Sequence, residues 1–222
     1  MDQELFLKKF RYNQVFYAVG ADEFLKQILN SDPARAALPS LASLGEVTDV
    51  SYRQMNCTVV NMSYFDFLEE LNIVNPNTAG LQGCLDEYIH GIQCGDKLRT
   101  GLLFEEDENY DELQQDKYQH EFIFKLMQFI ALGGALNQFE QSATEYLEAT
   151  KDMYKDLVCV AKDENTDEIK PMSMAFKINS VTTSNGVGLP SSDEHPQNFT
   201  YVIVDPLKWH ATVFQNKWKS SW

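Results

Sequence analysis

The chain is poor in basic residues. Its 222 residues include 18 lysines and arginines against 33 aspartates and glutamates, which gives a formal charge of −15. A nucleic-acid backbone is bound mainly through lysine and arginine, so this balance argues against a nucleic-acid partner. An anionic membrane surface attracts basic segments for the same reason, and we expect no membrane partner. The acidity is typical of a soluble protein, or of one whose partner is basic.

Long apolar runs are also absent. No run approaches the 18 residues of a membrane-spanning helix, and the first residues, MDQELFLKKFRYNQ, lack the apolar core of a secretion signal. The four cysteines, Cys57, Cys84, Cys94 and Cys159, form no C-x-x-C pair. Because a chain of this length does not need disulfides to be stable, we expect reduced thiols. Since a secretion signal and a membrane span are lacking, we expect a protein of the cytosol or of another space without secretory entry.

The usual signatures of catalytic and metal sites are missing. The sequence contains neither the G-x-S-x-G of a nucleophile elbow nor the G-x-x-x-x-G-K-[ST] of a P-loop. Its histidines, His90, His120, His195 and His210, are far apart and form no H-x-x-x-H pair. The acid-rich segment 105–116 lacks the glycine and the final glutamate of a calcium-binding loop. We therefore predict no catalytic residue, no metal site and no cofactor.

An enzyme whose site is assembled from scattered residues remains an alternative. Any chain with Cys, His and Asp permits a triad, and Asp205, His210 and a cysteine are the residues that such a site would use here. A lone histidine such as His210 is more often a hydrogen-bonded structural residue than a catalyst.

The C-terminal end departs from the acidic composition. Residues 199–222 carry one acid and three lysines, so this segment is net +2 and the remainder of the chain is net −17. The candidate partner-binding residues are Tyr201, Trp209, His210, Lys217, Trp218 and Trp222. The competing interpretation is a C-terminal hairpin with buried aromatic residues and solvated lysines. We favour burial for Tyr201 and Trp209, and partner docking for Trp218 and Trp222.

The first hundred residues mix the two periodicities. The apolar side chains of Phe24, Leu25, Ile28 and Leu29 form one helical stripe. The pattern predicts a strand over 11–20, a helix over 21–32, a strand over 55–62, a helix over 64–73 capped by Ser63, and helical pieces over 81–104.

A glycine pair follows a segment that is apolar nearly all round. Such a segment, from Tyr118 to Leu132, predicts a buried helix. No basic residue near Gly133 and Gly134 is placed to pair with an anion, so we predict a close-packed helix end or kink rather than a phosphate loop. Ser142 and Glu145 then form the S-x-x-E capping box of a second helix that runs to about residue 157.

After residue 157 the period changes from 3.6 to 2. The pattern predicts four strands, over 157–161, 172–180, 199–204 and 209–214. Asp205 and Pro206 form the turn between the last two. These strands predict an α+β fold in which an antiparallel sheet has helices packed on one face. We expect one domain over 1–222, with possible parts at 1–62, 63–157 and 158–216 and a tail at 217–222.

Three blocks carry a resemblance: LGGALNQFE, YLEATKDMYKDLVCV and YVIVDPLKWH. They resemble the family of cilia- and flagella-associated protein 300, which assists the assembly of axonemal dynein arms. The matching residues are Leu132 to Leu136, Gln138, Glu140, Tyr146 to Glu148, Thr150, Lys151, Tyr154 to Val158, Val160, Tyr201, Ile203 to Pro206 and His210. Weaker similarity covers most of the chain, and it fades in 105–116, in 182–198 and after Phe214.

The resemblance implies a protein of the cytoplasm and the cilium or flagellum, needed for outer and inner dynein arms. The implied partners are axonemal dynein subunits, other dynein assembly factors and the intraflagellar transport machinery. The family offers no catalytic residue or cofactor to carry over, so the expected role is that of a non-enzymatic adaptor. The alternatives are an enzyme with a cryptic site that serves dynein maturation, and a structural subunit of the axoneme.

Overall fold

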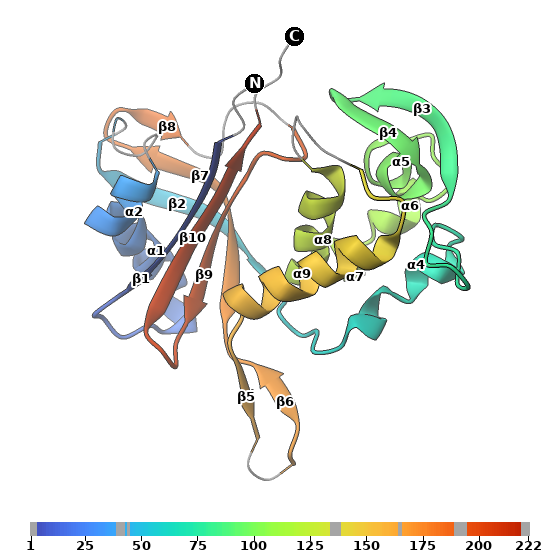
Figure 1. Cartoon of the computed structure of the whole chain (residues 1–222). Helices are drawn as coiled ribbons and strands as arrows, with labels where there is room; N and C mark the ends of the chain where they lie inside the picture. The colour runs from blue at the N-terminus through green and yellow to red at the C-terminus, as the bar shows by residue number, and fades with distance from the viewer. Residues whose placement is uncertain are drawn as a thin grey trace.

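The computed structural model describes residues 4–38, 43, 45–133, 139–163, 166–188 and 195–218. A six-stranded sheet crosses the molecule, and five of its strands follow the order β1-β10-β9-β7-β2 while β8 pairs with β7 (Figure 1). All neighbouring strands are antiparallel. The strands are β1 (Glu4–Arg11), β2 (Val47–Met55), β7 (Met174–Thr183), β8 (Gly186–Gly188), β9 (Phe199–Asp205) and β10 (His210–Lys217). The predicted α+β class with an antiparallel sheet is confirmed.

The membership of the sheet differs from the prediction. Two of its strands, β1 and β2, come from the N-terminal part, so residues from 1–62 and 158–216 share one sheet. The predicted strand near residue 160 is only β5 (Val160–Lys162), which pairs with β6 (Ile169–Pro171) in a separate hairpin. The first and last residues of β5, Val160 and Lys162, are both exposed, so this strand does not pack an apolar face against the core.

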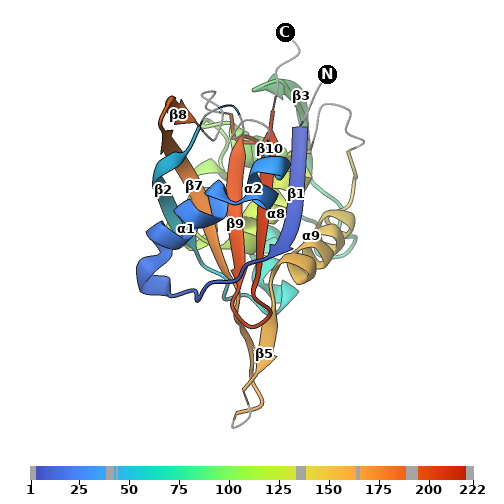
Figure 2. The same cartoon turned by 90° about the vertical axis from the view of Figure 1, so that its left-hand side faces the viewer.

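Helices cover both faces of the sheet, so the prediction of one covered face is wrong. On one face lie α1 (Ala21–Asn30) and α2 (Asp32–Ala37), and on the other α8 (Phe122–Leu132) and α9 (Ala143–Leu157), as Figures 1 and 2 show. The first six residues of β9 are all buried. Val202 and Val204 join the α1 side of the core, and Tyr201 and Ile203 join the α8 side. A strand buried on both faces requires a layer of helices on each.

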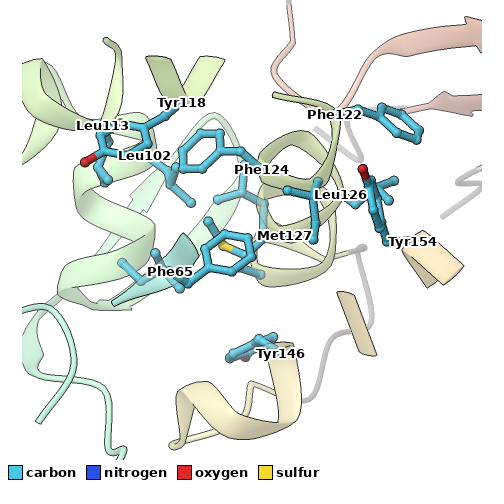
Figure 3. Packing of buried hydrophobic residues seen from close by; sticks show 14 of the residues in the cluster. Phe65, Leu102, Leu113, Tyr118, Phe122, Phe124, Leu126, Met127, Tyr146 and Tyr154 are labelled. Atoms are coloured by element: carbon cyan, nitrogen blue, oxygen red, sulfur yellow. The ribbon is translucent and has the colours of Figure 1, made fainter. Parts of the chain in front are cut away.

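The middle of the chain forms short elements beside α8. They are η2 (Met62–Phe65), α4 (Phe67–Glu70), β3 (Gly83–Ile89), β4 (Ile92–Asp96), α5 (Lys97–Leu103), α6 (Tyr110–Leu113) and α7 (Asp116–Gln119). In Figure 3, Phe124, Leu126 and Met127 of α8 lie between Tyr118 and Leu113 on one side and Tyr154 on the other, and Phe122 lies beside Tyr154. The α8 side of the core therefore joins the short elements to α8 and α9.

Several boundaries predicted in the first hundred residues are wrong. The strand near residue 11 is β1, which ends at Arg11, and η1 (Ala18–Gly20) lies where the strand was expected to finish. Strand β2 precedes the predicted strand over 55–62. The cap near residue 63 is Asn61, whose side-chain oxygen accepts from the N–H of Ser63 at 3.1 Å. The range 81–104 contains the β3–β4 hairpin, because His90 and Gly91 both have positive φ and make a two-residue turn.

The buried helix over Tyr118–Leu132 is present as α8, and it ends at Gly133. This glycine has φ 62°, and its N–H donates to the carbonyl of Phe129 at 3.0 Å. The Gln197 amide donates to the carbonyls of Phe129 and Gly133, at 3.0 and 2.8 Å. A helix end that needs positive φ favours glycine, so Gly133 closes the helix. Gly134 lies outside the described residues.

Helix α9 begins as the capping pattern indicates. Its N-cap is Ser142, whose hydroxyl accepts from the N–H of Thr144 at 3.1 Å. A hydrogen bond with the Ser142 side chain lowers the pKa of the Glu145 carboxyl. The cap fixes where α9 starts, and its buried stripe then packs on α8.

Candidate functional site

The C-terminal candidates are not a single surface patch. Trp209 precedes the first residue of β10, and Trp218 follows its last. Because the eight extended residues of β10 separate them, the two tryptophans lie at opposite ends of the strand, ~30 Å apart. Trp222 lies outside the described residues.

Two of these candidates are buried. Tyr201 is 3% exposed and packs against Phe122 with ring centroids 5.3 Å apart. Trp218 is 7% exposed and stacks on His195 at 4.7 Å, and its backbone N–H donates to the Asn198 side chain at 2.6 Å. The prediction that Trp218 docks a partner is therefore wrong, because its ring covers the segment that precedes β9.

Trp209 behaves in the opposite way. It is 40% exposed, against the burial that the sequence favoured, and it has φ 57°. Its ring stacks on Tyr12 at 5.7 Å. Lys217 pairs in register with Glu4 at the far end of β10. Trp209 is thus an exposed ring at a hairpin tip, remote from Lys217.

Asp205, His210 and Cys159 do line one hollow, as the enzyme alternative requires. Its volume is about 50 Å³, far below the several hundred cubic ångströms of a substrate site. Asp205 Oδ1 accepts from the N–H groups of Leu207 and Lys208, at 3.0 Å each. The carboxylate thus holds the turn that contains Pro206, and no hydrogen bond joins it to His210 or Cys159, all three of which the structure describes.

The clearest binding feature is an apolar groove, which we define by the residues that line it. Its volume is about 530 Å³. The lining residues come from the segment before η2, from α8, from α9 and from the β5–β6 hairpin: Val59, Val60, Asn61, Met62, Ile123, Lys151, Tyr154, Lys155, Val158, Val160 and Ile169. Figure 1 shows this hairpin projecting from the body beyond the end of α9. The volume falls in the range of sites that receive an apolar side chain or ligand.

The floor of the apolar groove is buried and its rim is exposed. Ile123 and Val158 are 2% and 4% exposed, whereas Val60, Val160 and Ile169 are 57%, 49% and 55% exposed. Three exposed aliphatic side chains therefore line one depression and make its rim apolar. Such a surface marks an interaction site more often than scattered apolar residues do.

One edge of the groove is basic. Lys151 and Lys155 are exposed and lie one turn apart on α9, on the face that also presents Tyr154 and Val158. Neither lysine forms an ion pair with a described residue. The chain has a net charge of −15, so two lysines without an ion-pair partner among the described residues are an exception. Beside apolar side chains, these two positive charges are suited to an acidic, amphipathic partner.

The described part of the chain holds no group of three His, Cys, Asp or Glu side chains that would bind a metal ion. The four cysteines are not joined in disulfides. No helix in the described ranges has the length and apolar character needed to cross a membrane.

Comparisons with known proteins agree with one another. The family model described as cilia- and flagella-associated protein 300 matches residues 1–216. A protein of that name from Paramecium tetraurelia is 31% identical over 215 residues, covering 96% of this chain and 82% of its own length. One from Chlamydomonas reinhardtii is 29% identical over 224 residues, covering 96% and 85%. No solved structure matches the chain significantly. The chain therefore belongs to the family of cilia- and flagella-associated protein 300.

Proposed function

We propose that this protein is a non-enzymatic adaptor for the cytoplasmic preassembly and intraflagellar transport of axonemal outer and inner dynein arms. Membership of a cilia- and flagella-associated family supports the ciliary setting. The proposed link to dynein arms rests on the sequence blocks that resemble the family. Its partners are axonemal dynein subunits, other assembly factors and the transport machinery, and it works in the cytoplasm and the cilium.

The observation that carries the proposal is the apolar groove. Its occupant is an amphipathic segment of a dynein subunit or assembly factor, with apolar side chains on one face and acids beside them. The apolar face enters between Val60, Val160 and Ile169, and the acids face Lys151 and Lys155. Helices bind grooves in this way when their apolar residues recur at i, i+3 and i+7.

The acidic surroundings add specificity. A segment with acids spread over all its faces is repelled by a body of this charge, and one without acids gains nothing from the two lysines. The groove therefore selects a segment by the position of its charges as well as by its apolar face.

Affinity purification from ciliated-cell cytosol tests the proposal. The tagged full chain is compared with the variants Val60→Glu and Ile169→Glu, which place charge on the rim of the groove. Val19→Glu is the matched control, because Val19 is fully exposed and is not one of the residues that line the groove. We expect dynein subunits and assembly factors to co-purify with the unaltered chain and the control, and to be lost from the groove variants.

Two outcomes count against the proposal. If the unaltered chain captures no dynein subunit or assembly factor, the adaptor role fails. If the groove variants capture them as well as the control does, while remaining folded by circular dichroism, the adaptor role stands but the groove is not the surface it uses.

A further inference from the structure

A second cavity lies on the α8 side of the sheet, away from the apolar groove. Its volume is about 510 Å³, and its walls come from α8, β7, β9, the segment after α5 and the segment before β9. Two lysines line it, Lys125 of α8 and Lys177 of β7, together with amide side chains such as Gln119 and Gln128. We call it the two-lysine cavity.

The sheet register places a third cation beside these lysines. Lys177 lies directly opposite Arg53 in the β2–β7 pairing. Like charges on directly opposite residues destabilise a sheet, so the pairing of Lys177 with Arg53 is not explained by a gain in stability. Burial, then the charges of Lys177 and Arg53, lowers the pKa of Lys125 to about 7. Burial, then the charge of Arg53, also lowers the pKa of Lys177.

Neither lysine forms an ion pair with an acid in the part of the chain that the structure describes. The Nζ of Lys125 donates to the side-chain oxygens of Gln119 and Gln128, the latter at 2.9 Å. The side chain of Lys177 has no hydrogen bond or ion pair with a described residue. Arg53 contacts the ring nitrogen of His120 at 3.0 Å. In a chain with 33 acidic residues, two partly buried lysines without a carboxylate are an unusual arrangement.

The remaining titratable groups of the cavity lie elsewhere on its lining. Glu105 and Glu106 are exposed residues of the segment after α5, and neither forms an ion pair with the lysines. Tyr110, Tyr201, His90 and His195 complete the titratable lining. The cavity is therefore cationic at the two lysines, and its two acids are solvent-exposed.

We propose that the two-lysine cavity is a binding site for a phosphate monoester group, held between Lys125 and Lys177. A phosphate monoester carries about −1.5 to −2 charges at neutral pH and compensates both lysines, whereas a carboxylate compensates one. Gln128 presents its oxygen to Lys125, so its NH₂ group is available as a further donor, whereas the NH₂ group of Gln119 already donates to the carbonyl of Leu113 at 2.6 Å. The volume accommodates either a small phosphorylated molecule or a phosphorylated side chain of a partner.

Thermal unfolding of the full chain, titrated with inorganic phosphate at constant ionic strength, is the first test. We expect the melting temperature to rise with phosphate. The effective dissociation constant should increase about tenfold in Lys125→Met and in Lys177→Met, since each substitution removes a charge-assisted bond. Lys8→Met is the matched control, because Lys8 is an exposed lysine of β1 outside the cavity, and its titration should equal that of the unaltered chain.

Phosphoserine and a phosphoserine peptide distinguish the two sources of the group. Equal binding of phosphoserine and the peptide indicates a small molecule, and tighter binding of the peptide indicates a phosphorylated partner. The proposal is overturned if phosphate leaves the melting temperature unchanged, or if the lysine variants respond as Lys8→Met does. Since a destabilised variant would confuse the melting curves, ³¹P NMR line broadening of phosphoserine provides a second measurement at a temperature where all variants are folded.

Discussion

Arg99 of α5 donates from Nε to the carbonyl oxygen of Ala131 near the end of α8, at 3.0 Å, although it is only 2% exposed. Its guanidinium also contacts the carboxylate of Asp96 and the hydroxyl of Tyr146 on α9, and it lies 4.0 Å from the ring centroid of Phe139. One side chain thus joins α5, the end of α8 and the start of α9. It satisfies a carbonyl that the helix end leaves unpaired.

The first prediction concerns this arginine. Arg99→Met should lower the free energy of unfolding by ~3–5 kcal/mol, because Asp96 is then a buried carboxylate without its partner. Urea unfolding followed by tryptophan fluorescence measures the loss. The double variant Asp96→Asn, Arg99→Met should recover part of it, because asparagine still accepts from the backbone N–H of residue 99. Equal stability of the single and double variants would contradict this explanation.

The second prediction is a pH dependence at Lys125. Its pKa is about 7 in the folded chain against an ordinary 10.5, so between these values the unfolded chain binds more protons. Lys125 therefore destabilises the folded state increasingly as pH falls from 10.5, and fully below 7. Lys125→Met should raise the free energy of unfolding by ~1–3 kcal/mol at neutral pH, and this gain should vanish toward pH 10.5.

Urea titrations at several pH values between these limits measure that difference. Lys8→Met serves as the control, since this exposed lysine should show no comparable gain. A stability difference that does not change with pH would mean that the substitution acts through packing rather than through charge.

The third prediction compares two tyrosines of α9. The Tyr154 hydroxyl is buried without a hydrogen-bond partner among the described residues, whereas the Tyr146 hydroxyl contacts Arg99 and accepts from the N–H of Glu140 at 2.7 Å. Tyr154→Phe should leave stability unchanged or raise it by up to ~1 kcal/mol, and Tyr146→Phe should lower it by ~1–3 kcal/mol. Chemical unfolding of both variants decides the comparison, and a larger loss for Tyr154→Phe would reveal a partner for its hydroxyl.

The sequence predicted those elements in which apolar residues recur at a regular spacing within one segment. The stripes of α1, α8 and α9 and the Ser142 cap are readable because each depends on residues three or four positions apart. The β3–β4 hairpin was missed because its turn, His90 and Gly91, contains none of the strongest turn pairs. Strand β1 was misplaced because its partner, β10, lies two hundred residues away.

The sites depend on contacts between distant segments, and this is why the sequence did not show them. The apolar groove combines Val60, Tyr154 and Ile169, which no periodicity links. The two-lysine cavity depends on a register that sets Arg53 opposite Lys177. Val160 and Ile169 are exposed apolar residues of two very short strands, and their exposure cannot be read from the sequence.

The fourth prediction reverses the roles that the sequence favoured for two tryptophans. Trp218→Ala should lower the free energy of unfolding by ~3–5 kcal/mol, because a buried ring stacked on His195 is removed. Trp209→Gly should change it by ~1 kcal/mol or less. The lost stacking on Tyr12 is offset because glycine adopts the positive φ at this position without strain. Urea unfolding followed by circular dichroism avoids a change of fluorophore between the variants. A larger loss for Trp209→Gly than for Trp218→Ala would restore the original interpretation, in which Trp209 is a core residue and Trp218 is free to meet a partner.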